Sequence, residues 1–441
     1  MNKDNDPRMT AGAGERIGVG RGLVAVSPIV VFLLFYLAVS IAIGDFYKMP
    51  ISVALLIASA WAVVIQRGRS IAGSVEEFSR TAGSPDVLYM IWIFILAGAF
   101  ATLAVKVGAV DATVNLALRY LPTQLIIPGL FMAACFISVA IGTSVGTVVA
   151  LTPLAVEMAQ SGGGDVPFFV AITLGGAFFG DNLSFISDTT IAATRTQGCA
   201  MRDKFRANLK IVLPAALITL ALYVFLGAEV PDMTPATAAN YWLITPYMLV
   251  IVTALMGINV TVVLAMGIVA TLVLGWIEGF GTIEMFGFMG TGIEGVGGLV
   301  IITLLAAGML GLIKAAGGIQ FILQALTARI SGRRGAQGAV AVLVGIVNLC
   351  TANNTVAIIT VGPLARDIAR RFDIQPRRMA SILDTCSCIV QCLIPYGAQT
   401  LLATGLAGIS PTAPFGYLYY PWALTLCVAL AIALPARRAK I

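Results

Sequence analysis

Asp181 and Asp188 lie seven residues apart in the most polar stretch of an otherwise apolar segment. If this stretch is helical, the spacing places both carboxylates and Ser184 on one face. Oxygen ligands of this kind suit a hard cation such as Na⁺. One carboxylate can hold either H⁺ or Na⁺ but not both, which is the simplest chemistry for exchange. The candidate cation or proton ligands are Asp181, Asn182, Ser184, Ser187, Asp188 and Thr189.

A second polar face with the same spacing follows about 200 residues later, at Asp384, Ser387 and Gln391. We align Gly180–Ser184 with Leu383–Ser387 at an offset of 203 residues, which makes Asp384 the counterpart of Asp181. Asp384 and Ser387 are therefore further candidate cation ligands. Two upstream alignments, at offsets of 209 and 210, join Leu96–Phe100 to Leu305–Met309 and Ser138–Ala155 to Asn348–Ala365.

Two long apolar segments, 124–160 and 335–365, are interrupted by polar residues. Helix breaks expose backbone groups that lipid cannot satisfy, so the breaks must line protein or a wet cavity. Half-helix N-termini at such breaks attract anionic groups through their free N–H groups. The candidate substrate-binding residues at and beside the breaks are Thr143, Ser144 and Thr147 in the first, and Asn353, Asn354, Thr355 and Gln391 in the second.

The chain that must position these residues has the composition of a membrane protein. Of its 441 residues, 59% are hydrophobic and 11% are charged, and the mean hydropathy is +0.95. A soluble domain carries about 25% charged residues. Apolar runs of the length that a bilayer requires recur many times, without the alternation of barrel strands. We predict an all-α polytopic membrane protein with about 11–13 transmembrane or re-entrant segments.

The distribution of Lys and Arg predicts the topology. Basic residues should mark the cytoplasmic loops. This places both termini inside, and it requires the two broken segments to enter the membrane from opposite faces. The basic loops are 67–80, 195–210, 329–334 and 366–378, whereas loops 157–167, 228–242, 277–297 and 397–416 contain neither Lys nor Arg.

The alignments and the topology together predict an inverted repeat. Inverted repeats with interrupted helices are typical of secondary transporters, which bind their substrate at the breaks. We divide the chain into a cytoplasmic tail (1–22), an N-terminal helix pair (23–86), a first repeat (87–227), a connecting segment with a helix pair (228–297) and a second repeat (298–441).

The composition also excludes several functions. The chain has no histidine, which excludes a histidine base and histidine-ligated metals. The net charge of +6 comes from short loops and does not indicate nucleic-acid binding. We expect no cofactor and no metal other than transported Na⁺. The expected partners are the lipid bilayer and small ions or a small organic solute, and a homodimer is one candidate assembly.

Structural alternatives to the site remain open. Asp181 or Asp188 would serve equally well as a cap of a broken helix or as a partner of Arg195. Asp384 would serve as a structural hydrogen-bond acceptor. Asn353 and Asn354 would satisfy the backbone at the second break. A channel is disfavoured by paired breaks that enter from opposite faces, and an intramembrane enzyme by the lack of a convincing nucleophile and base.

The motif FFGDNLSFISDTTIAATRTQG at Phe178–Gly198 resembles the Na⁺/H⁺ antiporter NhaC family of the ion transporter superfamily. The family string Gly-Asp-x-x-Ser-x-x-Ser-Asp-Thr-Thr follows a Gly-Thr-Ser-x-Gly-Thr break, here at Gly142–Thr147. The resemblance covers roughly residues 87–436. It implies a transporter of the bacterial inner membrane in which Asp181 and Asp188 bind the cation or proton. Relatives also carry organic acids or amino acids, so a carrier coupled to Na⁺ or H⁺ is the alternative to Na⁺/H⁺ exchange.

Overall fold

The computed structural model describes residues 17–43, 49–120, 123–184, 187–227, 240–256, 258–327, 330 and 332–434. Residues 1–16 of the predicted tail lie outside this range. Within the described residues the chain is helical and contains no strand. Seven of the described helices are long and apolar enough to cross a membrane, and shorter apolar helices accompany them. The predicted all-α, multi-pass membrane class is confirmed.

The helices follow one another in two series of ten, with short 3₁₀ turns between some of them. The first series is α1 (Val19–Ile43), α2 (Ile51–Val64), α3 (Ile71–Ala82), α4 (Pro85–Lys106), α5 (Ala109–Tyr120), α6 (Ile126–Ile141), α7 (Ser144–Ser161), α8 (Val166–Leu183), α9 (Asp188–Gln197) and α10 (Met201–Gly227). The second is α11 (Thr245–Leu255), α12 (Val260–Ile277), α13 (Thr282–Gly295), α14 (Gly297–Ala315), α15 (Gly318–Thr327), α16 (Gly332–Thr351), α17 (Asn354–Arg371), α18 (Pro376–Cys392), α19 (Ala398–Leu406) and α20 (Tyr419–Ala433).

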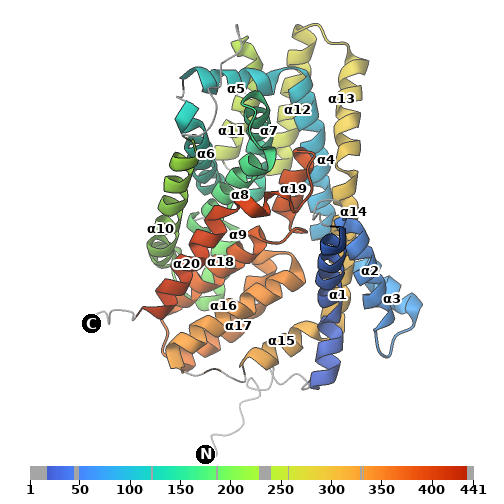
Figure 1. Cartoon of the computed structure of the whole chain (residues 1–441), viewed down its shortest axis with the longest axis vertical. Helices are drawn as coiled ribbons and strands as arrows, with labels where there is room; N and C mark the ends of the chain where they lie inside the picture. The colour runs from blue at the N-terminus through green and yellow to red at the C-terminus, as the bar shows by residue number, and fades with distance from the viewer. Residues whose placement is uncertain are drawn as a thin grey trace, which may run out of the picture.

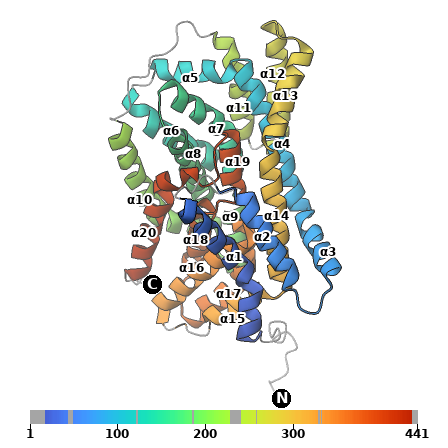
Figure 2. The ribbon, with the colours of Figure 1, turned by 45° about the vertical axis from the view of Figure 1, so that its right-hand side comes forward.

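The two series run in opposite directions. Figure 1 shows α5 across one end of the molecule and α15 across the other, each following the long helix α4 or α14. The hairpin of α6 and α7 enters from the end where α5 lies, and the hairpin of α16 and α17 enters from the end of α15 (Figures 1 and 2). The tips of both hairpins lie in the middle of the molecule. The arrangement is that of an inverted repeat with broken helices.

The turns between the helices correct the register of the predicted alignment. α7 ends and α8 begins at Ser161 and Val166, and α17 ends and α18 begins at Arg371 and Pro376, so both turns have the same length. Because the two turns do not differ in length, equivalent residues of the two series remain 210 positions apart after the turn. The predicted alignment at 203 is therefore wrong.

Two hydrogen bonds confirm the offset of 210 within the helices. Ser138 Oγ donates to the carbonyl of Ala177, and Asn348 Nδ2 donates to the carbonyl of Ser387 in the second series. Each bond joins residues 39 apart. The residue of α18 that occupies the place of Asp181 is consequently Gln391 and not Asp384.

Each series packs its outer helices on the other series. α2 and α3 pack against α14, and in the same way α12 and α13 pack against α4. Glycines make these close crossings possible, because small residues let helix backbones approach one another. A Cβ on Gly98 of α4 would overlap the carbonyl oxygen of Gly292 on α13. A Cβ on Gly308 of α14 would overlap the ring of Phe78 on α3.

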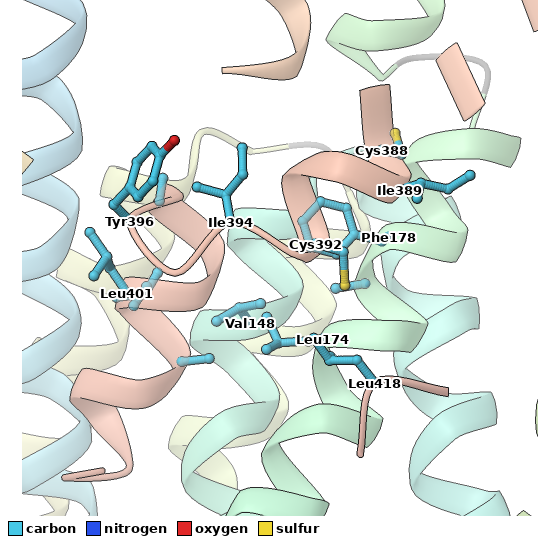
Figure 3. Close-up of a cluster of buried hydrophobic side chains, with 14 of the residues drawn as sticks. Val148, Leu174, Phe178, Cys388, Ile389, Cys392, Ile394, Tyr396, Leu401 and Leu418 are labelled. Atoms are coloured by element: carbon cyan, nitrogen blue, oxygen red, sulfur yellow. The ribbon is translucent and has the colours of Figure 1, made fainter. Parts of the chain in front are cut away.

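At the centre of the molecule, too, helices of one series pack on helices of the other. α9 packs on α17, and α19 packs on α7, so each short helix after a break contacts the hairpin of the other series. Buried apolar side chains fill the space around them. Figure 3 shows one such cluster, in which Val148, Leu174 and Phe178 lie near Cys392 and Leu401. This packing holds both hairpins and the breaks between them as one core.

Candidate functional site

The polar stretch with the two aspartates is not one continuous helix. α8 ends at Leu183, and α9 begins at Asp188 after Ser187, whose side chain accepts from the backbone N–H of Thr190. The predicted single face through Asp181, Ser184 and Asp188 is therefore wrong. Instead, Asp181 lies in the last turn of α8 and Asp188 in the first turn of α9, on the two sides of a break.

Asp181 is held by the first turn of α7. Its Oδ1 accepts from the backbone N–H of Ser144 at 3.0 Å, and its Oδ2 accepts from Ser144 Oγ at 2.6 Å. The Asp181 side chain is 5% exposed. A helix N-terminus carries partial positive charge and free N–H groups, which donate hydrogen bonds to a carboxylate partner. Asp181 therefore caps a broken helix, which was one of the structural alternatives. The capped helix is α7 and not α8, which carries Asp181.

A chain of side-chain amides connects this carboxylate to the other hairpin. Gln399 Nε2 donates to Ser144 Oγ at 3.0 Å, and Gln391 Nε2 donates to Gln399 Oε1 at 3.1 Å. Gln391 Nε2 also donates to the carbonyl of Ala352 at the second hairpin tip, at 3.1 Å. Gln391 Oε1 has no hydrogen-bond partner among the residues that the structure describes. The two hairpin tips are therefore linked through polar groups, and one acceptor remains open.

These groups surround a small cavity of about 130 Å³. By volume the cavity can hold an ion together with several waters. The N-terminal turns of four helices, α7, α9, α17 and α19, contribute to its wall. Asp188 is exposed to it, whereas Asp181 is buried in its lining. Ten predicted site residues line the cavity: Thr143, Ser144, Asp181, Ser187, Asp188, Thr189, Asn353, Asn354, Thr355 and Gln391.

The other predicted site residues are buried outside the cavity lining. Thr147 Oγ1 donates to the carbonyl of Thr143, and Ser387 Oγ donates to the carbonyl of Asp384. These two hydroxyls therefore bond to the backbone of their own helices. The predicted residues absent from the cavity lining are Thr147, Asn182, Ser184, Asp384 and Ser387.

Backbone carbonyls at the break are satisfied by side chains from the first turn of α9 and from Ser187, which caps it. Ser187 Oγ and Thr189 Oγ1 both donate to the carbonyl of Asp181, at 3.1 and 3.2 Å. Thr190 Oγ1 donates to the carbonyl of Ser184 at 2.9 Å. Lipid offers no donor for the last carbonyls of a helix, so these hydroxyls are what allow α8 to end inside the protein.

Sequence reasoning missed Lys204, which it placed among the charges of a cytoplasmic loop. The side chain is 1% exposed, and its Nζ lies 2.7 Å from Oδ2 of Asp384, which is itself fully buried. Asn208 Nδ2 donates to the same carboxylate oxygen at 2.7 Å. Asp384 is thus paired with a fixed cation and does not face the cavity.

Gln399 was missed as well, because the absence of Lys and Arg from 397–416 predicts an external loop there. A lone amide shortly before the apolar run Leu401–Ala403 is the sequence signal that could have found it.

A larger cavity of about 440 Å³ adjoins the first and shares six lining residues with it: Met90, Thr143, Val145, Asp188, Asn353 and Ala398. Its wall is mostly apolar and comes mainly from α4, α7 and α12. The side chains on this wall include Ile93, Phe94, Val145, Val149, Val260, Val263 and Leu264. A volume of this size is typical of a pocket for a small organic molecule. We call it the vestibule.

Comparison with known proteins identifies the family. The model of the Na⁺/H⁺ antiporter family matches residues 18–228 and 233–436. The chain belongs to the Na⁺/H⁺ antiporter family. The resemblance to NhaC proteins is confirmed: the Na⁺/H⁺ antiporter NhaC of Bacillus subtilis is 24% identical, over 74% of this chain and 79% of that protein. The chain is accordingly a secondary transporter.

Similarity extends to a relative with a different named activity. The malate-2H⁺/Na⁺-lactate antiporter of Bacillus subtilis is 21% identical, over 92% of this chain and 93% of that protein. Among solved structures, the YdaH transporter of Alcanivorax borkumensis aligns with a TM-score of 0.41 and 14% identity, covering 92% of this chain and 97% of that one.

Proposed function

We propose that this member of the Na⁺/H⁺ antiporter family exchanges Na⁺ for H⁺ at the cavity between Asp181 and Asp188. The observation that carries the proposal is the buried carboxylate of Asp181, held by the first turn of α7 beside a cavity that can hold an ion with several waters. The oxygens of the carboxylates, of Thr189 and of Gln391 Oε1 offer the ligands that a hard cation prefers. A proton on either carboxylate removes the charge that binds Na⁺, so the two ions compete.

The proposed cycle uses the inverted arrangement of the hairpins. Because the hairpin of α6 and α7 and the hairpin of α16 and α17 enter from opposite ends, movement of one series against the other would open the cavity to each side in turn. The hydrogen bond between Gln399 and Ser144 joins the two series at this point. The basic loops support a cytoplasmic position for both termini in the bacterial inner membrane.

The experiment is Na⁺-driven proton movement in proteoliposomes with an internal pH dye. Asp181→Asn keeps the shape of the side chain but removes its charge, so we expect exchange to be abolished. Asp165→Asn is the matched control, because Asp165 is an exposed residue in the turn before α8. Exchange by Asp181→Asn at the rate of the unsubstituted protein would refute the proposal.

The vestibule supports a second candidate function, which is Na⁺- or H⁺-coupled transport of a small organic acid or amino acid. The described linings of the cavity and the vestibule contain no Lys or Arg. A substrate carboxylate would then bind to the N-terminal turns of α17 and α19 and to the amides of Asn353 and Gln399. In this case Asp181 and Asp188 would hold only the coupling ion.

Filling the vestibule separates the two functions. Val260→Trp places a large side chain into the vestibule at a half-buried position and leaves the carboxylates untouched. Ion exchange alone should proceed unchanged in this variant, whereas uptake of a labelled dicarboxylate, monocarboxylate or amino acid should be lost. Solute uptake that depends on Na⁺ in the unsubstituted protein, and that Val260→Trp abolishes, would favour the second function.

A further inference from the structure

Lys204 lies near the start of α10 and reaches into the break between α8 and α9. Its ammonium donates to the carbonyl of Asn182 at 2.8 Å and to Thr190 Oγ1 at 2.6 Å, and it pairs with Asp384 Oδ2 at 2.7 Å. A lysine ammonium has three N–H donors. All three are matched by an acceptor, one on each of the helices α8, α9 and α18.

Asn208, one helical turn after Lys204, strengthens the same connection. Its Nδ2 donates to the carbonyl of Asn182 at 2.8 Å and to Asp384 Oδ2 at 2.7 Å. The last turn of α8 is thereby tied to α18, a helix of the other series, through two side chains of α10. The carbonyl end of α8 carries partial negative charge, which the Lys204 ammonium balances.

A buried ion pair of this kind is weak evidence for stability, because desolvation of both charges offsets much of their attraction. Its location is more informative. Two of the three acceptors of Lys204, on Asn182 and Thr190, flank the residues that form the break, and Asp181 directly precedes Asn182 in the chain. The position of the Asp181 carboxylate therefore depends on where Lys204 holds the end of α8.

We propose that Lys204 is a positioning residue for the cavity between Asp181 and Asp188. Its ammonium acts as a permanently bound cation that holds the end of α8 and the start of α9 in place. By pairing with Asp384 it also removes that carboxylate from the groups that transported cations can reach. The inference rests on the proposed exchange function, which it deepens.

The test uses the full chain in proteoliposomes, with the KM for Na⁺, the turnover at saturating Na⁺ and the thermal stability of the purified protein as readouts. Lys204→Gln and Asp384→Asn each leave one buried charge without its partner, and we expect both to lose stability. The double variant K204Q/D384N restores charge balance but supplies only two N–H donors from residue 204. Lys210→Gln is the matched control, because Lys210 is an exposed lysine on the same helix.

We expect the double variant to recover stability relative to either single variant and to keep a KM for Na⁺ raised by about tenfold or more, the effect of losing one hydrogen bond to a charged group. Thr190→Val offers a second route, because it removes one acceptor of the ammonium and leaves both charges in place. It also removes the hydrogen bond from Thr190 Oγ1 to the carbonyl of Ser184. It should raise the KM more than it lowers the turnover. This variant decides the matter if the double variant does not fold.

An unchanged KM in both the double variant and Thr190→Val would overturn the proposal and leave Lys204 as a partner of Asp384 only. An unchanged KM in Thr190→Val alone would do the same if the double variant fails to fold. Asp181→Asn, measured in the same assay, separates this failure from failure of the exchange function. If Asp181→Asn still exchanges ions, the proposed function is wrong whatever the Lys204 variants show.

Discussion

Gly180 allows α8 to approach α6 directly beside Asp181, and its replacement by alanine should damage the site from within the fold. A Cβ on Gly180 would lie 2.5 Å from the backbone carbonyl carbon of Ser138 and closer still to the Ser138 side chain. Ordinary contacts of a Cβ begin at 3.4 Å. Because a backbone atom is among the overlapping atoms, a rotamer change cannot relieve the clash, and α8 must move away from α6 by about 1 Å.

The expected cost has two parts. Overpacking of a tight core costs about 1–3 kcal/mol in stability. A displacement of about 1 Å is also enough to misplace a functional group and to slow its chemistry substantially. Since Asp181 follows Gly180 in the chain, its bonds to the first turn of α7 should lengthen, and we expect Na⁺/H⁺ exchange to fall by tenfold or more, equivalent to about 1.4 kcal/mol.

Gly338→Ala on α16 is the matched control, since a Cβ there meets no atom within 4 Å. The same chemical change should stabilise this helix by about 0.5–1 kcal/mol, because alanine loses less backbone entropy than glycine. The assays are thermal unfolding of the purified protein and proton movement in proteoliposomes. If Gly180→Ala matched Gly338→Ala in both assays, the close approach of α6 and α8 would not position the site.

Three further changes test separate features. Ala352→Gly should stabilise the second hairpin by about 1 kcal/mol in thermal unfolding, because Ala352 has a φ of +49° that glycine adopts without strain; a loss of stability would contradict this. Asn353→Ala removes the side chain that accepts from the backbone N–H of Val356 at the start of α17 and should cost about 1 kcal/mol, whereas Asn353→Asp should restore most of it. The Arg80 guanidinium, hydrogen-bonded to Glu77, holds the pKa of the Glu77 carboxyl below its usual range, so this pair stabilises the fold above about pH 4.3 and less as the pH falls through the lowered value. Glu77→Gln should therefore cost under about 1 kcal/mol at pH 7 and progressively less as the pH falls below about 4.3, as measured by urea unfolding.

Hydropathy and loop charge predicted the class and the inverted arrangement, because both are properties of whole segments. Apolar runs long enough to span a membrane and groups of arginines can be recognised even when the helix ends are misplaced by a few residues. The breaks at Gly142–Thr147 and near Asn353 were found for the same reason, since polar residues inside an apolar segment need a local explanation.

The predicted alignment of the two repeats is wrong where it rests on single residues. Asp181 and Asp384 are each followed by a serine three positions later, and this similarity suggested an offset of 203. The helix positions give 210 and pair Asp181 with Gln391. A short polar pattern carries no information on the length of the preceding turn, which fixes the register.

Lys204 could not be found from the sequence, because a charge near the start of a span has the same appearance whether it faces headgroups or a buried carboxylate. Its burial depends on Asp384, which lies 180 residues away. Only the packing of α10 on α18 brings the two side chains together.

The outer helices of each series pack on the other series, and this has a consequence for synthesis of the chain. α3 is made early, yet α14, on which it packs, follows only after about 200 further residues, which take roughly ten to forty seconds to translate. Throughout that interval Phe78 and its neighbours on α3 lack the surface that finally covers them. The nascent first half should therefore be the species most exposed to proteases and insertion chaperones, and the ribosome must reach α14 before that half acquires its native partners.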